Sequence, residues 1–134
     1  MRYKAALALL TLSLSGNLMA QLGYVRNDTI PVSNIGALPN PWAGGLNFCQ
    51  FSEIDLNFDG IQDLFVFDRT GFRVTTYING GTANQVDYKH APQYQAAFPA
   101  DLHDWVLLRD YDCDGKMDIF TYQSPGVRVF HNTS

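Results

Sequence analysis

One acidic loop occurs twice in the sequence, at an offset of 55 residues, and this repeat constrains the fold more than any other feature. The segment 55–74, DLNFDGIQDLFVFDRTGFRV, aligns without gaps on the segment 110–129, DYDCDGKMDIFTYQSPGVRV. Eight aligned positions are identical: Asp55/Asp110, Asp59/Asp114, Gly60/Gly115, Asp63/Asp118, Phe65/Phe120, Gly71/Gly126, Arg73/Arg128 and Val74/Val129. The two nine-residue windows that begin the segments hold seven of the thirteen Asp and Glu residues, and such clustering needs a physical reason.

The loops have the composition of a calcium site. Several carboxylates within nine residues repel one another unless a cation neutralises them, and oxygen ligands at alternate positions suit the about six to eight oxygen contacts of calcium. Glycine at position 6 of each loop is expected where the chain turns so sharply that a Cβ would clash. The predicted ligands are Asp55, Asn57, Asp59, the backbone carbonyl of Ile61 and Asp63 in the first loop, and Asp110, Asp112, Asp114, the backbone carbonyl of Lys116 and Asp118 in the second. We therefore predict two calcium ions, and the alternative is a pair of solvated acidic turns.

The residues after each loop distinguish between families that share its beginning. The pattern D-x-[DN]-x-D-G also opens EF-hands and dockerins. An EF-hand closes with a bidentate Glu at position 12, whereas Val66 and Thr121 occupy that position here. The residues that follow are β-branched and aromatic, then come a glycine-containing turn and a second apolar run, which predicts strand, turn and strand. Successive apolar residues at 64–67 predict a strand covered on both faces.

The remaining pattern predicts further strands and turns. The strands are expected at 51–54, 64–68, 72–78, 105–109, 119–122 and 127–131, with a turn at 79–81. The insert 82–104 is expected to form an outer strand and a long crossover. Cys49 and Cys113 occupy different places in the repeat, so we predict two unpaired thiols.

The loops and their strands resemble the FG-GAP or VCBS repeat of integrin-α-like β-propellers, and repeats in large secreted bacterial surface proteins. The resemblance covers roughly 42–132 and implies an all-β fold with two antiparallel β-propeller-type blades, each with a calcium-binding loop between its first two strands. It also implies the same ten calcium ligands. Closed propellers have about four to eight blades, so two blades form a partial propeller, and further blades of a longer chain are expected partners.

The N-terminus has the features of a Sec signal peptide. Arg2 and Lys4 precede the apolar run AALALLTLSL, and cleavage is expected after Ala20. The run of ten residues is about half of the roughly 20 needed to cross a bilayer, so no membrane span is predicted. The expected organisation is a signal peptide at 1–20, an extended lead-in at 21–41 and two repeats at 42–134. The expected location is secreted or at the cell surface, with the bacterial outer surface favoured.

Charge and side-chain patterns narrow the class of function. The formal net charge is −4 with no basic run, so nucleic acid is not an expected partner. The three histidines, His90, His103 and His131, show neither metal-ligand spacing nor an adjacent nucleophile, so no zinc or catalytic role is predicted. Trp42 and Trp105 are interpreted as packing residues rather than a sugar platform. Arg73 and Arg128, equivalent in the ungapped alignment, are expected to pair with carboxylates.

The sequence thus predicts a calcium-binding module with a structural, adhesion or ligand-binding role at the cell surface. It predicts no chemistry of its own, and a protein or a glycan is the expected ligand. One alternative is the non-catalytic part of a secreted polysaccharide-active enzyme. A second is a dockerin-like, calcium-dependent interaction module, which requires a helix after each loop.

Overall fold

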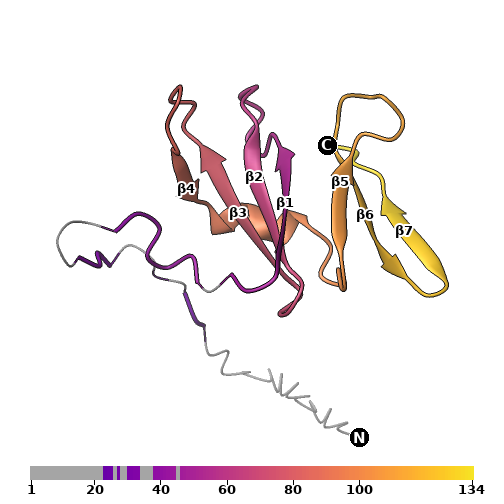
Figure 1. The fold of residues 1–134 in the computed structure, drawn as a ribbon, viewed down its shortest axis with the longest axis horizontal. Coiled ribbons are helices and arrows are strands. Elements are labelled where there is room, and N and C mark those ends of the chain that lie inside the picture. The colour runs from indigo at the N-terminus through magenta and orange to yellow at the C-terminus, as the bar shows by residue number, and fades with distance from the viewer. Residues whose placement is uncertain (1–22, 26, 28–29, 34–37, 45) are drawn as a thin grey trace, which may run out of the picture.

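The computed structural model describes residues 23–25, 27, 30–33, 38–44 and 46–134 (Figure 1). The predicted signal peptide at 1–20 and parts of the predicted lead-in lie outside these residues. Within the described part of the chain, no helix has the length and apolar character needed to cross a membrane.

The described residues form an all-β fold with two antiparallel sheets. The first sheet has the order β1-β2-β3-β4, with β1 at Cys49–Ile54, β2 at Asp63–Asp68, β3 at Arg73–Asn79 and β4 at Tyr88–His90. The second has the order β5-β6-β7, with β5 at Val106–Arg109, β6 at Asp118–Gln123 and β7 at Gly126–Phe130. A 3-10 helix, η1 (Pro92–Ala97), lies in the connection between the sheets. The six predicted strands and the outer strand of the insert are confirmed, and the two sheets do not close into a ring.

The hydrophobic core lies between the two sheets, which stand side by side with β1 next to β5 (Figure 1). Phe65 and Phe67 of β2 are fully buried and cluster with Val106 and Leu108 of β5 and with Leu102. Two polar contacts join the sheets at the rim of this core. The Val106 N–H donates to Gln50 Oε1 at 2.9 Å, and Arg69 Nε donates to the Asp104 carbonyl at 2.6 Å.

The central strand β2 is buried on both faces, as its apolar run predicts. Phe65 and Phe67 face the second sheet, and Val66, which must point the opposite way, is also fully buried. Its neighbours on that opposite face, Thr75 and Tyr77 of β3, are buried as well. The first sheet is therefore covered on both sides around β2.

The second sheet is covered on one side only. Phe120 occupies the place in β6 that Phe65 occupies in β2, and its cross-strand neighbours are Leu107 and Val129. Leu107 is 40% exposed, Val129 is 42% exposed, and Tyr122 on the same face is 38% exposed. The face that the first sheet buries against its neighbour is thus open in the second sheet.

The strand register corrects the ungapped alignment of the two repeats. The turn between β2 and β3 leaves four residues between Asp68 and Arg73, whereas only Ser124 and Pro125 separate β6 from β7. Arg128 is therefore the counterpart of Thr75, and the Gly71/Gly126, Arg73/Arg128 and Val74/Val129 identities are not structural equivalences. The ungapped alignment matches the apolar pattern despite this error, because a shift of two residues keeps each side chain on the same face of a strand.

The two arginines, Arg73 and Arg128, both make side-chain contacts outside the strands that carry them. The Arg128 guanidinium pairs with the Asp101 carboxylate and donates to Gln123 Oε1, which confirms the expected carboxylate partner. Arg73 Nη2 donates to the Ala43 carbonyl at 3.2 Å. The predicted free thiols are confirmed for both Cys49 and Cys113.

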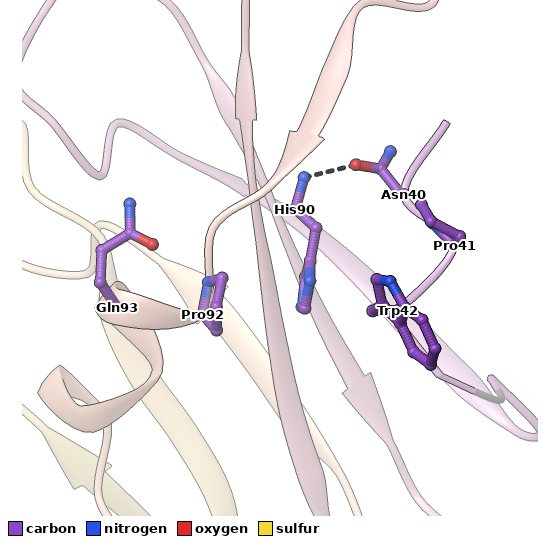
Figure 2. Close-up of a pocket in the computed structure, with 6 residues that line it drawn as sticks. All are labelled: Asn40, Pro41, Trp42, His90, Pro92 and Gln93. Atoms are coloured by element: carbon purple, nitrogen blue, oxygen red, sulfur yellow. Dashed lines mark hydrogen bonds between the residues drawn. The ribbon is translucent and has the colours of Figure 1, made fainter. Parts of the chain in front are cut away.

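A side chain from the lead-in covers the outer edge of β4. Asn40 Nδ2 donates to the Tyr88 carbonyl at 2.8 Å, and Asn40 Oδ1 accepts from the His90 N–H at 2.7 Å (Figure 2). Unpaired strand edges are templates for pairing with another chain, and Asn40 satisfies two such groups here. Asn40 and His90, with Trp42, line a hollow of about 310 Å³ (Figure 2). Trp105 is not part of this lining, so the hollow does not join the two tryptophans into one platform.

Candidate metal sites

Both acidic loops lie at the same end of the two sheets, at the top in Figure 1. The first connects β1 to β2, and the second connects β5 to β6. A hollow of about 490 Å³ between the sheets is lined by Asp55 and Phe58 from the first loop and by Met117 and Asn132 near the second. Strands follow both loops, so the dockerin-like alternative, which requires helices there, is wrong.

The side chains of the first loop are held in place by the N–H groups of the loop itself. The Asp59 N–H lies 3.2 Å from both Asp55 Oδ1 and Asn57 Oδ1, so these two oxygens converge on one donor. Asp55 Oδ2 accepts from the Gly60 N–H at 2.8 Å, and Asp59 Oδ1 accepts from the Ile61 N–H at 2.8 Å. Short Asx side chains favour such local bonds in turns. Oxygens of Asp55, Asn57 and Asp59 therefore turn toward the loop's own N–H groups, although Asp55, Asp59 and Asp63 do not bring three carboxylate oxygens within 4.8 Å of one another.

The second loop repeats this pattern. Asp110 Oδ2 accepts from the Gly115 N–H at 2.9 Å, and Asp114 Oδ1 accepts from the Lys116 N–H at 2.9 Å. Asp112 Oδ1 accepts from the Asp114 N–H at 3.3 Å, and Asn57 Oδ1 accepts from the Asp59 N–H of the first loop at 3.2 Å. Two contacts differ. Asp110 Oδ1 accepts from the Cys113 N–H at 2.7 Å, and the bond from Asn57 Nδ2 to Asp59 Oδ2 at 2.8 Å has no counterpart, because the carboxylate of Asp112 has no N–H to donate. Nine residues thus build nearly the same structure twice.

The last predicted ligand of each loop, Asp63 or Asp118, is fully buried. Asp63 Oδ2 accepts from the Leu56 N–H at 2.9 Å and its Oδ1 accepts from the Asn79 N–H at 2.8 Å. Asp118 accepts from the Tyr111 N–H at 3.2 Å and the Asn132 N–H at 2.8 Å in the same way. The Asn132 N–H bond is the main cause that holds the pKa of Asp118 below its usual range, and the Tyr111 N–H and the nearby His131 lower it further. The carboxylate is therefore kept ionised inside the fold.

Two asparagines complete the loops, and sequence reasoning missed them. Asn79 Nδ2 donates to the Gln62 carbonyl at 3.0 Å, and Asn132 Nδ2 donates to the Met117 carbonyl at 3.2 Å. Each residue also gives its backbone N–H to the buried Asp, so it fixes the loop to the end of the third strand. The two asparagines are 53 residues apart rather than 55, because the second hairpin is two residues shorter. An alignment that allows this gap would have paired them.

The glycines at position 6 have the expected backbone conformation but not the expected steric reason. Gly60 and Gly115 have φ of +83° and +88°, in the region that glycine adopts without cost. A Cβ on either residue would meet no atom within 4 Å, so the predicted clash is wrong and the backbone angle alone requires glycine. Phe58 and Cys113, at matching positions, also have positive φ, of 61° and 65°.

The donor chemistry fits a divalent cation. In the second loop, one oxygen each of Asp110, Asp112 and Asp118 lies within 4.8 Å of the others. A buried charge is costly unless it is paired or coordinates a metal. Asp63 is fully buried and accepts two N–H bonds, but it has no ion-pair partner among the residues that the structure describes. A bound cation would compensate its charge. A carboxylate has about four acceptor sites, so oxygens that accept one N–H bond each can still face an ion. The roles of the Ile61 and Lys116 carbonyls stay predictions.

A histidine that no sequence pattern singled out, His131, lies beside the second loop. His131 Nε2 is 3.0 Å from Asp112 Oδ2 and 3.9 Å from Asp114 Oδ2. The Lys116 ammonium also approaches Asp114 Oδ2, at 3.8 Å. His131 is 17 residues from Asp114 in the chain and arrives through β7, so spacing alone could not reveal it.

The family model for the FG-GAP-like repeat matches residues 55–121. The chain belongs to the FG-GAP-like repeat family. The match covers half of its 134 residues and includes both acidic loops of the FG-GAP-like protein. Comparisons with curated proteins and with solved structures gave no significant match.

Proposed function

We propose that the chain is a calcium-binding, non-catalytic repeat module of the β-propeller type. In this proposal it serves outside the cytoplasm as a structural, adhesion or ligand-binding part of a cell-surface protein. The observation that carries the proposal is the duplicated loop, in which short-range N–H bonds and one buried carboxylate hold a set of hard oxygens in place twice.

Calcium is favoured over smaller hard cations because of the ligand set. The loops offer many oxygens from flexible side chains and backbone, which suits the variable geometry and high coordination number of calcium. Magnesium demands near-octahedral geometry and keeps several waters. Because each site joins the start of the loop to the end of the third strand through the buried Asp and its Asn, an ion there would tie three strands of a sheet together.

The propeller assignment is supported by how the sheets stack. The face of β2 that carries Phe65 packs on the second sheet, and the matching face of β6 exposes apolar side chains. Large exposed apolar surfaces mark interaction sites. We propose that a further blade covers this face. Export is supported by the charged and apolar segments at the N-terminus.

The calcium sites can be tested separately by NMR. The amides of Gly60 and Gly115 donate to Asp55 and Asp110, so their ¹H–¹⁵N signals report on one loop each. Both signals should shift on titration with calcium, with dissociation constants on the order of 10⁻⁴ to 10⁻³ M, as in extracellular modules. Asp59→Asn should weaken the response of Gly60 alone, and Asp114→Asn that of Gly115 alone.

The matched control is Glu53→Gln, which removes an exposed carboxylate of β1 outside both loops. It should leave both titrations unchanged. If neither glycine signal responds at millimolar calcium, the proposed function is wrong. If the two loop variants and the control weaken binding equally, the binding is a general charge effect rather than a property of the loops.

A further inference from the structure

We propose that His131 makes the second loop a site with both nitrogen and oxygen ligands, which binds a transition-metal ion such as Zn²⁺. The first loop, without a histidine, does not bind such an ion. The inference rests on the proposed function in that both loops are taken to hold cations. It adds a difference in metal selectivity between two loops that are otherwise built alike.

Three ligand atoms from two parts of the chain converge at this point. His131 Nε2 and one carboxylate oxygen each of Asp112 and Asp114 lie within 4.8 Å of one another. The separations of His131 Nε2 from the two oxygens are 3.0 and 3.9 Å. Zinc bonds of about 2.0 to 2.2 Å in a tetrahedral site place ligand atoms roughly 3.3 Å apart. One ion can therefore be reached by all three groups with small side-chain movements.

The fold, rather than chance contact of a mobile side chain, places the imidazole there. His131 directly follows β7 and precedes Asn132, whose backbone and side chain are bonded to Asp118 and to the Met117 carbonyl. The Tyr111 ring packs edge-on against the imidazole, with ring centroids 6.3 Å apart. The His131 side chain is 47% exposed, so an ion can reach it from solvent.

The first loop lacks this nitrogen. By the strand register, Phe130 corresponds to Tyr77, so the counterpart of His131 is Ile78. In addition, Asn57 occupies the place of Asp112, so the first loop has one carboxylate fewer. Imidazole favours Zn²⁺, Cu²⁺ and Ni²⁺, whereas sites made only of carboxylate and carbonyl oxygens favour Ca²⁺, Mg²⁺ and Mn²⁺. The second loop should thus accept both classes of ion, and the first only the oxygen-seeking class.

The test compares Zn²⁺ and Ca²⁺ binding in full-chain variants made in a Cys113→Ser background, because Cys113 is exposed and lies between Asp112 and Asp114 in sequence. Zn²⁺ binding is measured by competition with a chromogenic chelator, and Ca²⁺ binding by the Gly115 amide shift. His131→Gln should weaken Zn²⁺ binding about 10-fold or more, since even outer-shell partners cost about 10- to 100-fold. Its Ca²⁺ binding at Gly115 should change far less.

His103→Gln is the matched control, because the His103 side chain is 39% exposed and its Nδ1 lies 2.8 Å from Asp104 Oδ2, and His103 belongs to no group of three potential metal ligands among the described residues. It should leave Zn²⁺ binding unchanged. Equal Zn²⁺ affinity in the parent and His131→Gln proteins, with Ca²⁺ binding intact, overturns the inference and makes His131 an ion-pair partner only. If the proposed function itself is wrong, the result differs, because the amide signals of Gly60 and Gly115 would then not shift with Ca²⁺ in any variant.

Discussion

In the first repeat the face of β2 that carries Phe65 is buried against the second sheet, whereas the matching face of β6, which carries Phe120, is open to solvent. The loops at the ends of these strands nevertheless make nearly the same hydrogen bonds, with the same residue spacings. Loop geometry in this protein therefore depends on the residues of each nine-residue loop and the Asn that contacts it. Burial of a sheet face instead depends on whether a neighbouring sheet covers it, as the second sheet covers the Phe65 face.

The largest expected difference between the repeats comes from their phenylalanines. Phe65 is fully buried and its ring centroid lies 4.7 Å from that of Phe98. Phe65→Ala should lower the free energy of unfolding by about 3 to 5 kcal/mol. Phe120 is only partly buried beside Tyr111, so Phe120→Ala should cost less than half as much. Urea denaturation in saturating calcium measures both. Equal losses would mean that the open face of the second sheet is covered in solution.

A second difference lies in the hairpins and depends on pH. Asp68 accepts N–H bonds from Thr70, Phe48 and Asn47, and the Thr70 bond is the main cause that lowers the pKa of this carboxyl. A lowered pKa in the folded state adds stability above the unfolded value of about 3.9, and this stability is lost as pH falls through the folded pKa. The counterpart in β6 is the neutral Gln123.

Asp68→Asn should therefore lower the melting temperature in chelator at pH 5 to 7, and the gap from the parent protein should close below about pH 3.9. Gln123→Ala should show no such closure over the same range. Differential scanning fluorimetry from pH 7 to pH 2 gives both curves. A gap for Asp68→Asn that stays constant to pH 2 would show that the ionised carboxylate does not stabilise the hairpin.

The smallest effects are expected where the repeats agree. Asn79→Ala and Asn132→Ala each remove the side-chain bond to a backbone carbonyl, of Gln62 or Met117, and the exposed local bonds that the amide oxygen accepts from Gly81 or Ser134. Both variants keep the backbone bond to the buried Asp. Each should cost about 1 kcal/mol, or roughly 4 to 8 °C in melting temperature for a domain of this size. A large effect of one variant and none of the other would break the equivalence of the two loops.

The strands and loops were predictable because their signals are local. The alternation after each loop, the apolar run 64–67 and the glycine at position 6 predict strands and turns in place. The pairing of residues between neighbouring strands could not be predicted from the sequence in the same way. Neither the shorter second hairpin nor the resulting equivalence of Asn79 and Asn132 follows from an ungapped alignment. The contact of His131 with Asp112 depends on strand register, which sequence spacing does not report.

The central claim, that both acidic loops are metal sites, is tested most directly by melting the protein in calcium and in chelator. Calcium that binds only the folded protein stabilises it by about 2.7 kcal/mol per site at 100 times the dissociation constant. The melting temperature should therefore rise by at least about 10 °C. Asp55→Ala and Asp110→Ala should each remove about half of this rise, and Glu53→Ala should preserve it. Equal melting temperatures in calcium and in chelator would contradict the assignment of both loops.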